Sequence, residues 1–256
     1  MITKSNWSRE DHIIAFNLYC RIPFGTIHIR NPKIQEFARL LGRSVGSVSY
    51  KLANFSRLDP SLQRRGIRGL EHGARGEEEV WAEFAERPEA LAYESQRLLA
   101  ERLGTSVEEV AHVATDDLPG SGKEREAIVR VRVNQDFFRS RVLSAYGFKC
   151  CVTGLTMRPL LVASHVVPWA EDPDNRLNSR NGLCLNALHD RAFDRLLMWI
   201  DTDFVVHLSP ELRKVNKDSK QTVDWLMSFE GKPLLLPRSF TPDPALLAKH
   251  AARRTR

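Results

Sequence analysis

Two imidazoles and one amide within the stretch from Leu161 to Leu197 form a set of side chains that suits metal-assisted hydrolysis: His165, Asn181 and His189. An imidazole with an ordinary pKa of about 6.5 is partly unprotonated near neutral pH, so it can activate water as a general base. A divalent cation held by a second imidazole would stabilise a leaving oxygen as a Lewis acid. An amide can donate and accept hydrogen bonds, so it can fix a loop around such a base.

The elements predicted around these residues are a strand, a polar loop, a second strand and a helix. The run from Leu160 to Pro168 is apolar and β-branched, which predicts a strand that ends at the proline, and residues 182–186, GLCLN, predict a second short strand. Residues 190–197 predict a helix. Between the strands, Asp, Asn, Pro and Ser residues can order the loop through local side-chain to backbone hydrogen bonds. The result is a ββα unit.

The residues in this unit resemble the HNH nucleases, a branch of the ββα-metal endonucleases. The similarity includes SHVVPW, NGLCLN and HDRAFD, and also YGFKCCVTG at residues 146–154, so that it covers about residues 125–210. The resemblance implies that His165 is the general base, that Asn181 holds the loop and that His189 is a metal ligand. It also implies one divalent metal ion per site, with Mg²⁺ favoured and Mn²⁺ or Ni²⁺ as alternatives, and products that carry 5′ phosphates.

The residue before the expected base departs from the pattern of the wider family. Many members have Asp or His there as a metal ligand, whereas this chain has Ser164, a poor ligand for a divalent cation. Nearby carboxylates, water and substrate oxygens can complete a magnesium shell. The nearby carboxylates are Asp172, Asp174, Asp190 and Asp194. Because such residues also serve as loop turns and helix caps, the sequence assigns none of them.

A second informative segment runs from Arg43 to Phe55 and predicts a helix capped by Ser44. Its apolar positions fall on one side, which leaves a polar face for DNA on the other side. The residues expected to contact DNA are Ser47, Tyr50, Lys51 and Asn54, followed by Arg57. With the helix predicted at residues 32–41 and the turn at Gly42, this segment resembles a helix-turn-helix, although a helical hairpin with a solvated face is the alternative.

The distribution of charge is more informative than the net charge of +6. Residues 1–75 contain 13 basic and five acidic groups, whereas residues 76–120 contain three and 12. A basic N-terminal part suits attraction to a phosphate backbone. The four cysteines form no CxxC pair, which removes the usual sequence sign of a zinc ribbon and leaves buried thiols as the expectation. The sequence contains no apolar run of about 20 residues and no signal-peptide core, so a cytoplasmic protein without a membrane partner is expected.

The sequence as a whole predicts an α+β protein of two domains. Residues 1–115 are expected to form a helical, helix-turn-helix-like module, and residues 116–127 a linker. Residues 128–256 are expected to form an HNH nuclease domain, with its ββα core at about 158–198. Within the nuclease domain we expect a strand at 128–133, a helix from Asn134 to Gly147 and a hairpin of residues 197–201 and 204–209 around Thr202 and Asp203. The expected function is metal-dependent cleavage of double-stranded DNA, in restriction or host defence, by a homodimer. The alternatives are a DNA-binding regulator with a decayed HNH unit and a structure-selective or RNA-directed nuclease.

Overall fold

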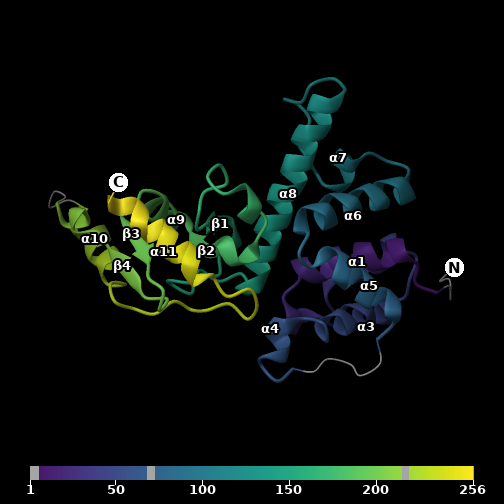
Figure 1. Cartoon of the computed structure of the whole chain (residues 1–256), viewed down its shortest axis with the longest axis horizontal. Helices are drawn as coiled ribbons and strands as arrows, with labels where there is room; N and C mark the ends of the chain where they lie inside the picture. Colours follow the sequence, from purple (N-terminus) through teal and green to yellow (C-terminus); the bar gives the residue numbers. More distant parts are fainter. Residues whose placement is uncertain (1–5, 68–72, 215–218, 256) are drawn as a thin grey trace. The chain divides into compact units, whose positions relative to one another are not determined.

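The computed structural model describes residues 6–67, 73–214 and 219–255, and its chain divides into two compact units, Met1–Arg141 and Val142–Arg256 (Figure 1). Helices and two small sheets occur together, which fits the predicted α+β class. No helix in the described ranges has the length and apolar character that a membrane crossing requires.

The first unit is helical. Its helices are α1 (Arg9–Arg21), α2 (Pro32–Leu40), α3 (Val45–Ser56), α4 (Pro60–Gln63), α5 (Arg75–Phe84), α6 (Pro88–Leu103), α7 (Val107–Val110) and most of α8 (Lys123–Ala145). Helix α1 packs against α3, α5 and α6, and Figure 1 shows it between α6 on one side and α3 with α5 on the other. Its buried ring Phe16 lies 5.0 Å from the ring of Phe55 on α3, centroid to centroid. Side chains from several helices therefore share one core.

Local sequence signals set the helix starts in this unit. Ser8 begins α1 with a capping box, in which its hydroxyl accepts from the Asp11 N–H and the Asp11 carboxylate accepts from the Ser8 N–H. Asn31 caps α2 ahead of Pro32, and Ser44 caps α3 by accepting from the N–H of Ser47. The cap predicted at Ser44 is confirmed.

The strand predicted at residues 128–133 is wrong, because these residues belong to helix α8. The alternation of Val and Arg there fits a strand, but Val129, Val133 and Phe137 also recur at a helical spacing of four. These three side chains are 1–3% exposed, whereas Val131 between them is 42% exposed. Helix α8 thus occupies the last residues of the expected linker, and the division between the two compact units lies within this helix, after Arg141.

The second unit contains two antiparallel strand pairs with helices around them. Its elements are β1 (Leu161–His165), β2 (Gly182–Asn186), α9 (Ala187–Asp194), β3 (Met198–Ile200), β4 (Val206–Leu208), α10 (Lys220–Met227) and α11 (Pro244–Ala252). Strand β1 pairs with β2, and β3 pairs with β4. Helix α9 packs against β1, β2 and β3. The predicted ββα order and the hairpin are confirmed, although β1 ends at His165 and α9 starts at Ala187.

Buried thiols contribute to both cores. Cys20 lies in the first unit, and Cys150, Cys151 and Cys184 lie in the second; all four are buried and none forms a disulfide. The N–H of Cys151 donates to the Cys184 carbonyl oxygen at 2.7 Å, which ties the segment before β1 to the middle of β2. The expected core role of the cysteines is confirmed.

Candidate active site

The register of the β1–β2 pair places His165 beside the end of the polar loop. His165 is the last residue of β1 and pairs with Gly182, the first residue of β2, so the loop at residues 166–181 begins and ends next to this imidazole. The N–H of Val166 donates to the Asn181 carbonyl oxygen at 2.9 Å and continues the pairing by one bond. The hairpin therefore holds both ends of the loop at the base expected from the sequence.

The imidazole of His165 is half-buried and oriented by a backbone group. Its Nε2 lies 2.9 Å from the carbonyl oxygen of Arg176. Because a carbonyl oxygen only accepts, Nε2 carries the proton in the neutral ring and Nδ1 is the basic nitrogen. Burial lowers the pKa of His165, and this effect exceeds the opposing effects of the Arg176 carbonyl and the Asp194 charge. His165 is thus a neutral imidazole near pH 7, as a general base must be.

The side chain of Asn181 is completely buried and holds the loop at two places. Its Oδ1 accepts from the Val167 N–H at 2.8 Å, and its Nδ2 donates to the Val167 carbonyl oxygen at 3.0 Å. Nδ2 also donates to the Asn175 carbonyl oxygen at 3.1 Å. One bonded segment directly follows His165, and the other directly precedes Arg176, whose carbonyl accepts from His165. Asn181 thereby joins the two chain segments that orient the imidazole.

Arg176 reinforces this part of the loop. Its Nε donates to the Trp169 carbonyl oxygen at 2.8 Å, and its guanidinium carbon lies 5.4 Å from the centroid of the Trp169 ring. The Trp169 ring in turn meets the His165 imidazole edge-on at 5.7 Å between centroids. The sequence did not single out Arg176 or Trp169, since a backbone carbonyl acceptor leaves no signature in residue type.

His189 is buried beside aromatic rings, and its Nε2 has no hydrogen-bond partner among the described residues. The residue is 0% exposed, and the rings of Trp225 and Phe229 lie 5.2 and 5.1 Å from its ring centroid. Its Nδ1 lies 3.0 Å from the Oδ1 of Asn186, the residue that caps α9. Burial alone lowers the pKa of His189 to about 4, with no charged group contributing. His189 is a neutral core imidazole with no carboxylate close enough to perturb it.

The carboxylate of the next residue lies on the side of α9 that faces β1. Burial and the nearby charge of Asp194 raise the pKa of Asp190, while the hydroxyl of Ser164 and the charge of Arg191 oppose the rise. Ser164 is buried, and its Oγ has no partner within normal hydrogen-bond geometry among the described residues. Asp194 also acts on His165, whose pKa its charge raises. Asp190 and Asp194 therefore gather near Ser164 and His165, the two residues at the end of β1.

His189 and Asp190 can each supply a ligand to a divalent cation. Across the described ranges, no group of three or more His, Cys, Asp or Glu side chains is placed to hold a metal ion. His189 can supply a nitrogen ligand, since Asn186 holds its Nδ1 and its buried Nε2 has no hydrogen-bond partner among the described residues. The rings of Trp225 and Phe229 beside it supply no oxygen ligand. Asp190 can supply an oxygen ligand, since a partly buried carboxylate with a second carboxylate nearby is stabilised by a cation. Water and substrate oxygens would supply the other ligands.

The expected DNA-contacting face of α3 does not form as predicted. Lys51 is 5% exposed and Asn54 is 2% exposed, and both bond to the carboxylate of Glu77 on α5, which is 0% exposed. The opposite, apolar side of α3 is also buried, as predicted, so α3 is covered on two sides. The prediction of an exposed face is wrong for Lys51 and Asn54, because α5 supplies a buried anion to them.

The other three residues expected to contact DNA, Ser47, Tyr50 and Arg57, are more exposed than Lys51 and Asn54. Tyr50 is 53% exposed. Ser47 is half-buried and accepts from the Trp7 indole N–H at 3.2 Å. The Arg57 side chain is 17% exposed and pairs with Glu78 at 2.9 Å. Burial of Glu77 could not be read from the sequence, where it is one of three consecutive glutamates at residues 77–79.

Comparison with known proteins bears on the second unit. No curated protein matches the chain. The family model of the HNH endonucleases matches residues 150–201, a range that contains β1, the loop, β2, α9 and β3. This range includes His165 and Asn181 in the arrangement described above. Residues 150–201 are therefore similar to the HNH endonucleases, which indicates a nuclease-type segment.

Proposed function

We propose that this protein is a metal-dependent endonuclease that hydrolyses phosphodiester bonds in double-stranded DNA. The observation that carries the proposal is the orientation of His165 within the segment that matches the HNH endonucleases. Its Nε2 is bonded to the Arg176 carbonyl, and the residues on both sides of that contact are held by Asn181. A neutral imidazole held in this way presents its basic Nδ1 to a water molecule without needing to reorient.

The chemical step assigned to His165 is removal of a proton from water as the water oxygen attacks phosphorus. The bond between phosphorus and the 3′ oxygen breaks, and the family resemblance implies that the phosphate stays on the 5′ end. Burial keeps the imidazole neutral before the reaction, and the nearby Asp194 carboxylate stabilises the imidazolium that forms. Asn181 acts as a positioning residue, because it touches the loop backbone and not the reacting atoms.

We propose two metal ligands: His189, as the family resemblance implies, and Asp190. The buried Nε2 of His189 has no partner among the described residues, and Asp190 lies near Ser164 and Asp194 at the end of β1. A bound divalent cation would supply Lewis-acid stabilisation of the leaving oxygen, with Mg²⁺ favoured by carboxylate and water ligands. Ser164 does not replace the missing carboxylate, so this site has fewer protein ligands than the wider family pattern.

A double-strand break requires two such sites, since one base cuts one strand per encounter. A two-fold homodimer is the simplest arrangement that supplies them. We further propose that the first unit contributes to DNA binding through its basic N-terminal part, with Tyr50 as the accessible residue of the predicted set. Restriction or another form of host defence is the biological role that a double-strand-cutting enzyme of this kind would serve.

A specific observation favours a second candidate function, a DNA-binding regulator whose HNH unit no longer cleaves. Ser164 stands where a ligand is usual, and no group of three metal-binding side chains occurs in the described parts of the chain. The two functions make opposite predictions for cleavage. The intact geometry of His165 and Asn181 favours the nuclease.

Incubation of supercoiled plasmid with the purified chain and Mg²⁺, Mn²⁺ or Ni²⁺ tests the proposal. Nicked or linear DNA should appear with at least one metal and disappear with EDTA. His165→Ala should retain the fold and DNA binding but lose cleavage by a factor on the order of 10²–10⁴. Absent cleavage by the unaltered chain, with DNA binding retained, would support the regulator instead, whereas cleavage that persists in EDTA would contradict the metal dependence.

A further inference from the structure

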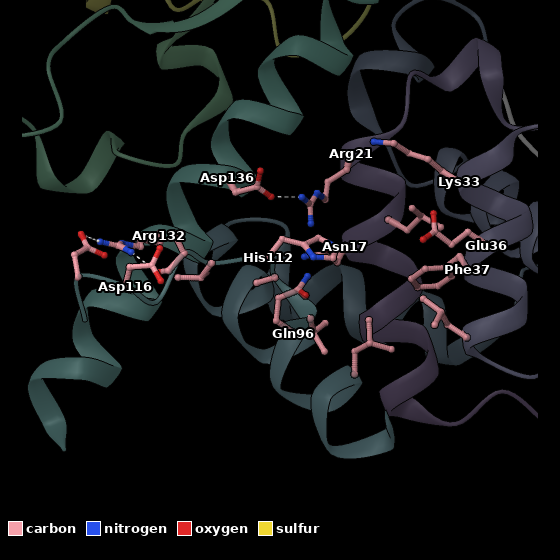
Figure 2. A pocket seen from close by; sticks show the side chains of 18 residues that line it. Asn17, Arg21, Lys33, Glu36, Phe37, Gln96, His112, Asp116, Arg132 and Asp136 are labelled. Carbon is pink, nitrogen blue, oxygen red and sulfur yellow. Dashed lines mark hydrogen bonds and ion pairs between the residues drawn. The ribbon is translucent and has the colours of Figure 1, made fainter. Parts of the chain in front are cut away.

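A cavity of about 880 Å³ lies within the first unit, apart from the HNH segment. It is bounded by one face of α1, one face of α2, the inner side of α6, the segment that follows α7 and part of α8, as Figure 2 shows. Its apolar wall includes Leu18, Phe37 and Leu99. The size lies within the range of sites for small organic ligands.

Two buried amides reach this cavity. Asn17 is 5% exposed and Gln96 is 8% exposed, and both line it. The Nδ2 group of Asn17 is buried and has no hydrogen-bond partner among the described residues. Figure 2 shows the two amide ends directed toward the same part of the cavity. A buried N–H donor without an acceptor is unfavourable unless a bound group supplies one, so the position of Asn17 indicates a ligand with an acceptor atom.

The charges around the cavity argue against a simple anion. The cationic side chains are Arg21, Lys33 and Arg132, and the carboxylates are Glu36, Asp116, Asp117 and Asp136. Arg21 is paired with Asp136, as a dashed line in Figure 2 indicates, and Arg132 is paired with Asp117. With three cations beside four carboxylates, the lining favours a neutral ligand over an isolated phosphate or carboxylate.

We propose that this cavity binds a single nucleobase. A nucleobase is neutral, carries donors and acceptors along one edge that amides such as Asn17 and Gln96 can read, and has flat faces that pack against Phe37. The base can arrive on a nucleotide extruded from duplex DNA or on a free nucleotide, and the chemistry at the amides is the same for both sources. Only the first source rests on the proposed action on DNA.

Ion pairs at the edge of the cavity hold together three of the chain segments that line it. Arg132 donates to the Ala114 carbonyl oxygen as well as to Asp117, so α8 fixes the segment that follows α7. Arg21 contacts Asp136 and the hydroxyl of Ser140, so α8 is also fixed to α1. The amides therefore lie in a preformed site, and a ligand would not need to order these segments when it binds.

Binding of mononucleotides to the full chain in EDTA tests the inference without cleavage. The probes are the four deoxynucleoside 5′-monophosphates, with 2-deoxyribose 5-phosphate as the base-free control, titrated by calorimetry. We expect at least one nucleotide to bind and the base-free control not to bind. Asn17→Leu and Gln96→Leu should each weaken nucleotide binding at least 10-fold, because each removes a group that reads the base edge.

Asn134→Leu is the matched control for Asn17→Leu. Asn134 is also 5% exposed, and its Oδ1 is a buried acceptor without a partner among the described residues, but Asn134 does not line the cavity. Its replacement should leave nucleotide binding unchanged. The thermal unfolding midpoint of each variant shows that the unit is folded, and Gln96→Leu tests the inference if Asn17→Leu does not fold.

A second pair of probes distinguishes the two sources of the base. A base in a mismatched pair costs less to extrude than a base in a matched pair. If the cavity takes an extruded base, the protein should therefore bind a duplex with one mismatch about 10-fold more tightly than the fully paired duplex. Asn17→Leu should lose this preference. Nucleotide binding without mismatch preference assigns the site to free nucleotides. The inference is wrong if neither probe responds, if 2-deoxyribose 5-phosphate binds as tightly as the nucleotides, or if both leucine variants bind as the unaltered chain does. Plasmid cleavage in Mg²⁺ is measured separately, so a failure of the nuclease proposal is distinguishable.

Discussion

The amide of Asn181 forms two hydrogen bonds with the backbone of Val167, accepting from its N–H at 2.8 Å and donating to its carbonyl oxygen at 3.0 Å. This pairing occurs two residues after His165 and across the neck of the loop that supplies the Arg176 carbonyl. Because the Asn181 side chain is 0% exposed, water cannot replace either bond. The placement of the imidazole therefore depends on one amide that does not itself contact the imidazole.

Asn181→Ala should reduce cleavage more than it reduces DNA binding. The change leaves the Val167 backbone groups unpaired in a buried site, which costs roughly 1–3 kcal/mol of unfolding free energy for each unsatisfied group. At a temperature where the variant is folded, kcat should fall at least 100-fold while KM changes little, because His165 loses its fixed position. Single-turnover and steady-state cleavage assays measure both quantities.

Asn178→Ala is the control for this effect. Asn178 belongs to the same loop and donates to the Asn175 side chain at 2.8 Å, but it does not bond to the segment after His165. Its replacement should change kcat by less than about 10-fold, since the orientation of the base is kept. Full activity of folded Asn181→Ala would show that the loop needs no such support.

The rate of cleavage should decline on the acid side only below pH 6.5. Burial lowers the pKa of His165 below its ordinary value, so the imidazole stays neutral and basic at pH 7 and gains its proton at a lower pH. Single-turnover rates between pH 5 and pH 8.5 measure this limb, and the limb should be absent from the residual rate of His165→Ala. An acid limb centred above pH 7 would contradict the environment described for this residue.

Asp190→Asn should raise the concentration of metal that cleavage requires, by at least 10-fold, because it removes the charged oxygen ligand. His189→Leu should also raise the metal requirement, because it removes the Nε2 that has no other partner among the described residues, and it should reduce thermal stability, since that imidazole packs between Trp225 and Phe229. Cleavage rates as a function of Mn²⁺ concentration measure the requirement. A raised requirement in only one of the two variants would identify that residue as the ligand and exclude the other.

The second unit should lose stability as the pH falls from 6.5 toward 4. Burial lowers the pKa of both His189 and His250 to about 4 in the folded chain. The unfolded chain, with an ordinary histidine pKa of about 6.5, binds these protons first, so acid favours unfolding across this window and the loss levels off below pH 4. Thermal unfolding midpoints measured at half-unit steps should show this decline.

His189→Leu should make the midpoint less dependent on pH within the same window, even if the variant is less stable at pH 7. An exposed imidazole serves as the control, so His28→Ala should leave the pH dependence as it is. A decline of equal steepness in His189→Leu and the unaltered chain would mean that other groups cause the acid sensitivity.

Glu77→Ala should strongly destabilise the first unit. The Glu77 carboxylate is fully buried and bonds to Lys51 and Asn54, and it also accepts from the Ala74 N–H at 2.8 Å. Its removal leaves the Lys51 ammonium buried without its anion, a change that costs about 3–5 kcal/mol. Glu79→Ala, which removes an exposed carboxylate paired with Arg75, should change the unfolding free energy by less than about 1 kcal/mol. Chemical denaturation of both variants makes the comparison.

The sequence was sufficient for the parts of the site that depend on local pattern. A β-branched run, a loop rich in Asp and Asn, and GLCLN predicted the strand–loop–strand order, and the amide chemistry of Asn181 predicted a loop-holding residue. The sequence was not sufficient to decide which of two neighbouring side chains on a helix faces the core. His189 and Asp190 are adjacent on α9, about 100° apart around its axis, and only packing against α10 shows which of them faces the core.

The first unit shows a related difficulty. A helical wheel separates Lys51 and Asn54 from the apolar side of α3 correctly, but it contains no information on what covers the polar side. The covering residue, Glu77, is 23 positions after Asn54 and belongs to a run of glutamates typical of a solvated surface. The alternation of Val and Arg at residues 128–133 predicted a strand in place of a helix for a similar reason. Apolar residues two apart in a strand pattern include residues four apart, which also fit one face of a helix.

Because Asn181 closes the neck of the loop, the domain should tolerate insertions outside the neck but not within it. Residues 170–174 lie outside the bonded neck, and their carboxylates Glu171 and Asp172 pair with Arg253 and Lys249 near the C-terminal helix. An insertion at this outer turn lengthens a surface loop at little entropic cost and leaves the neck intact. Sequence drift and engineering can therefore alter what this loop touches while the arrangement around His165 is preserved. A single-residue insertion between His165 and Val167 would instead move Val167 away from Asn181 and disturb that arrangement.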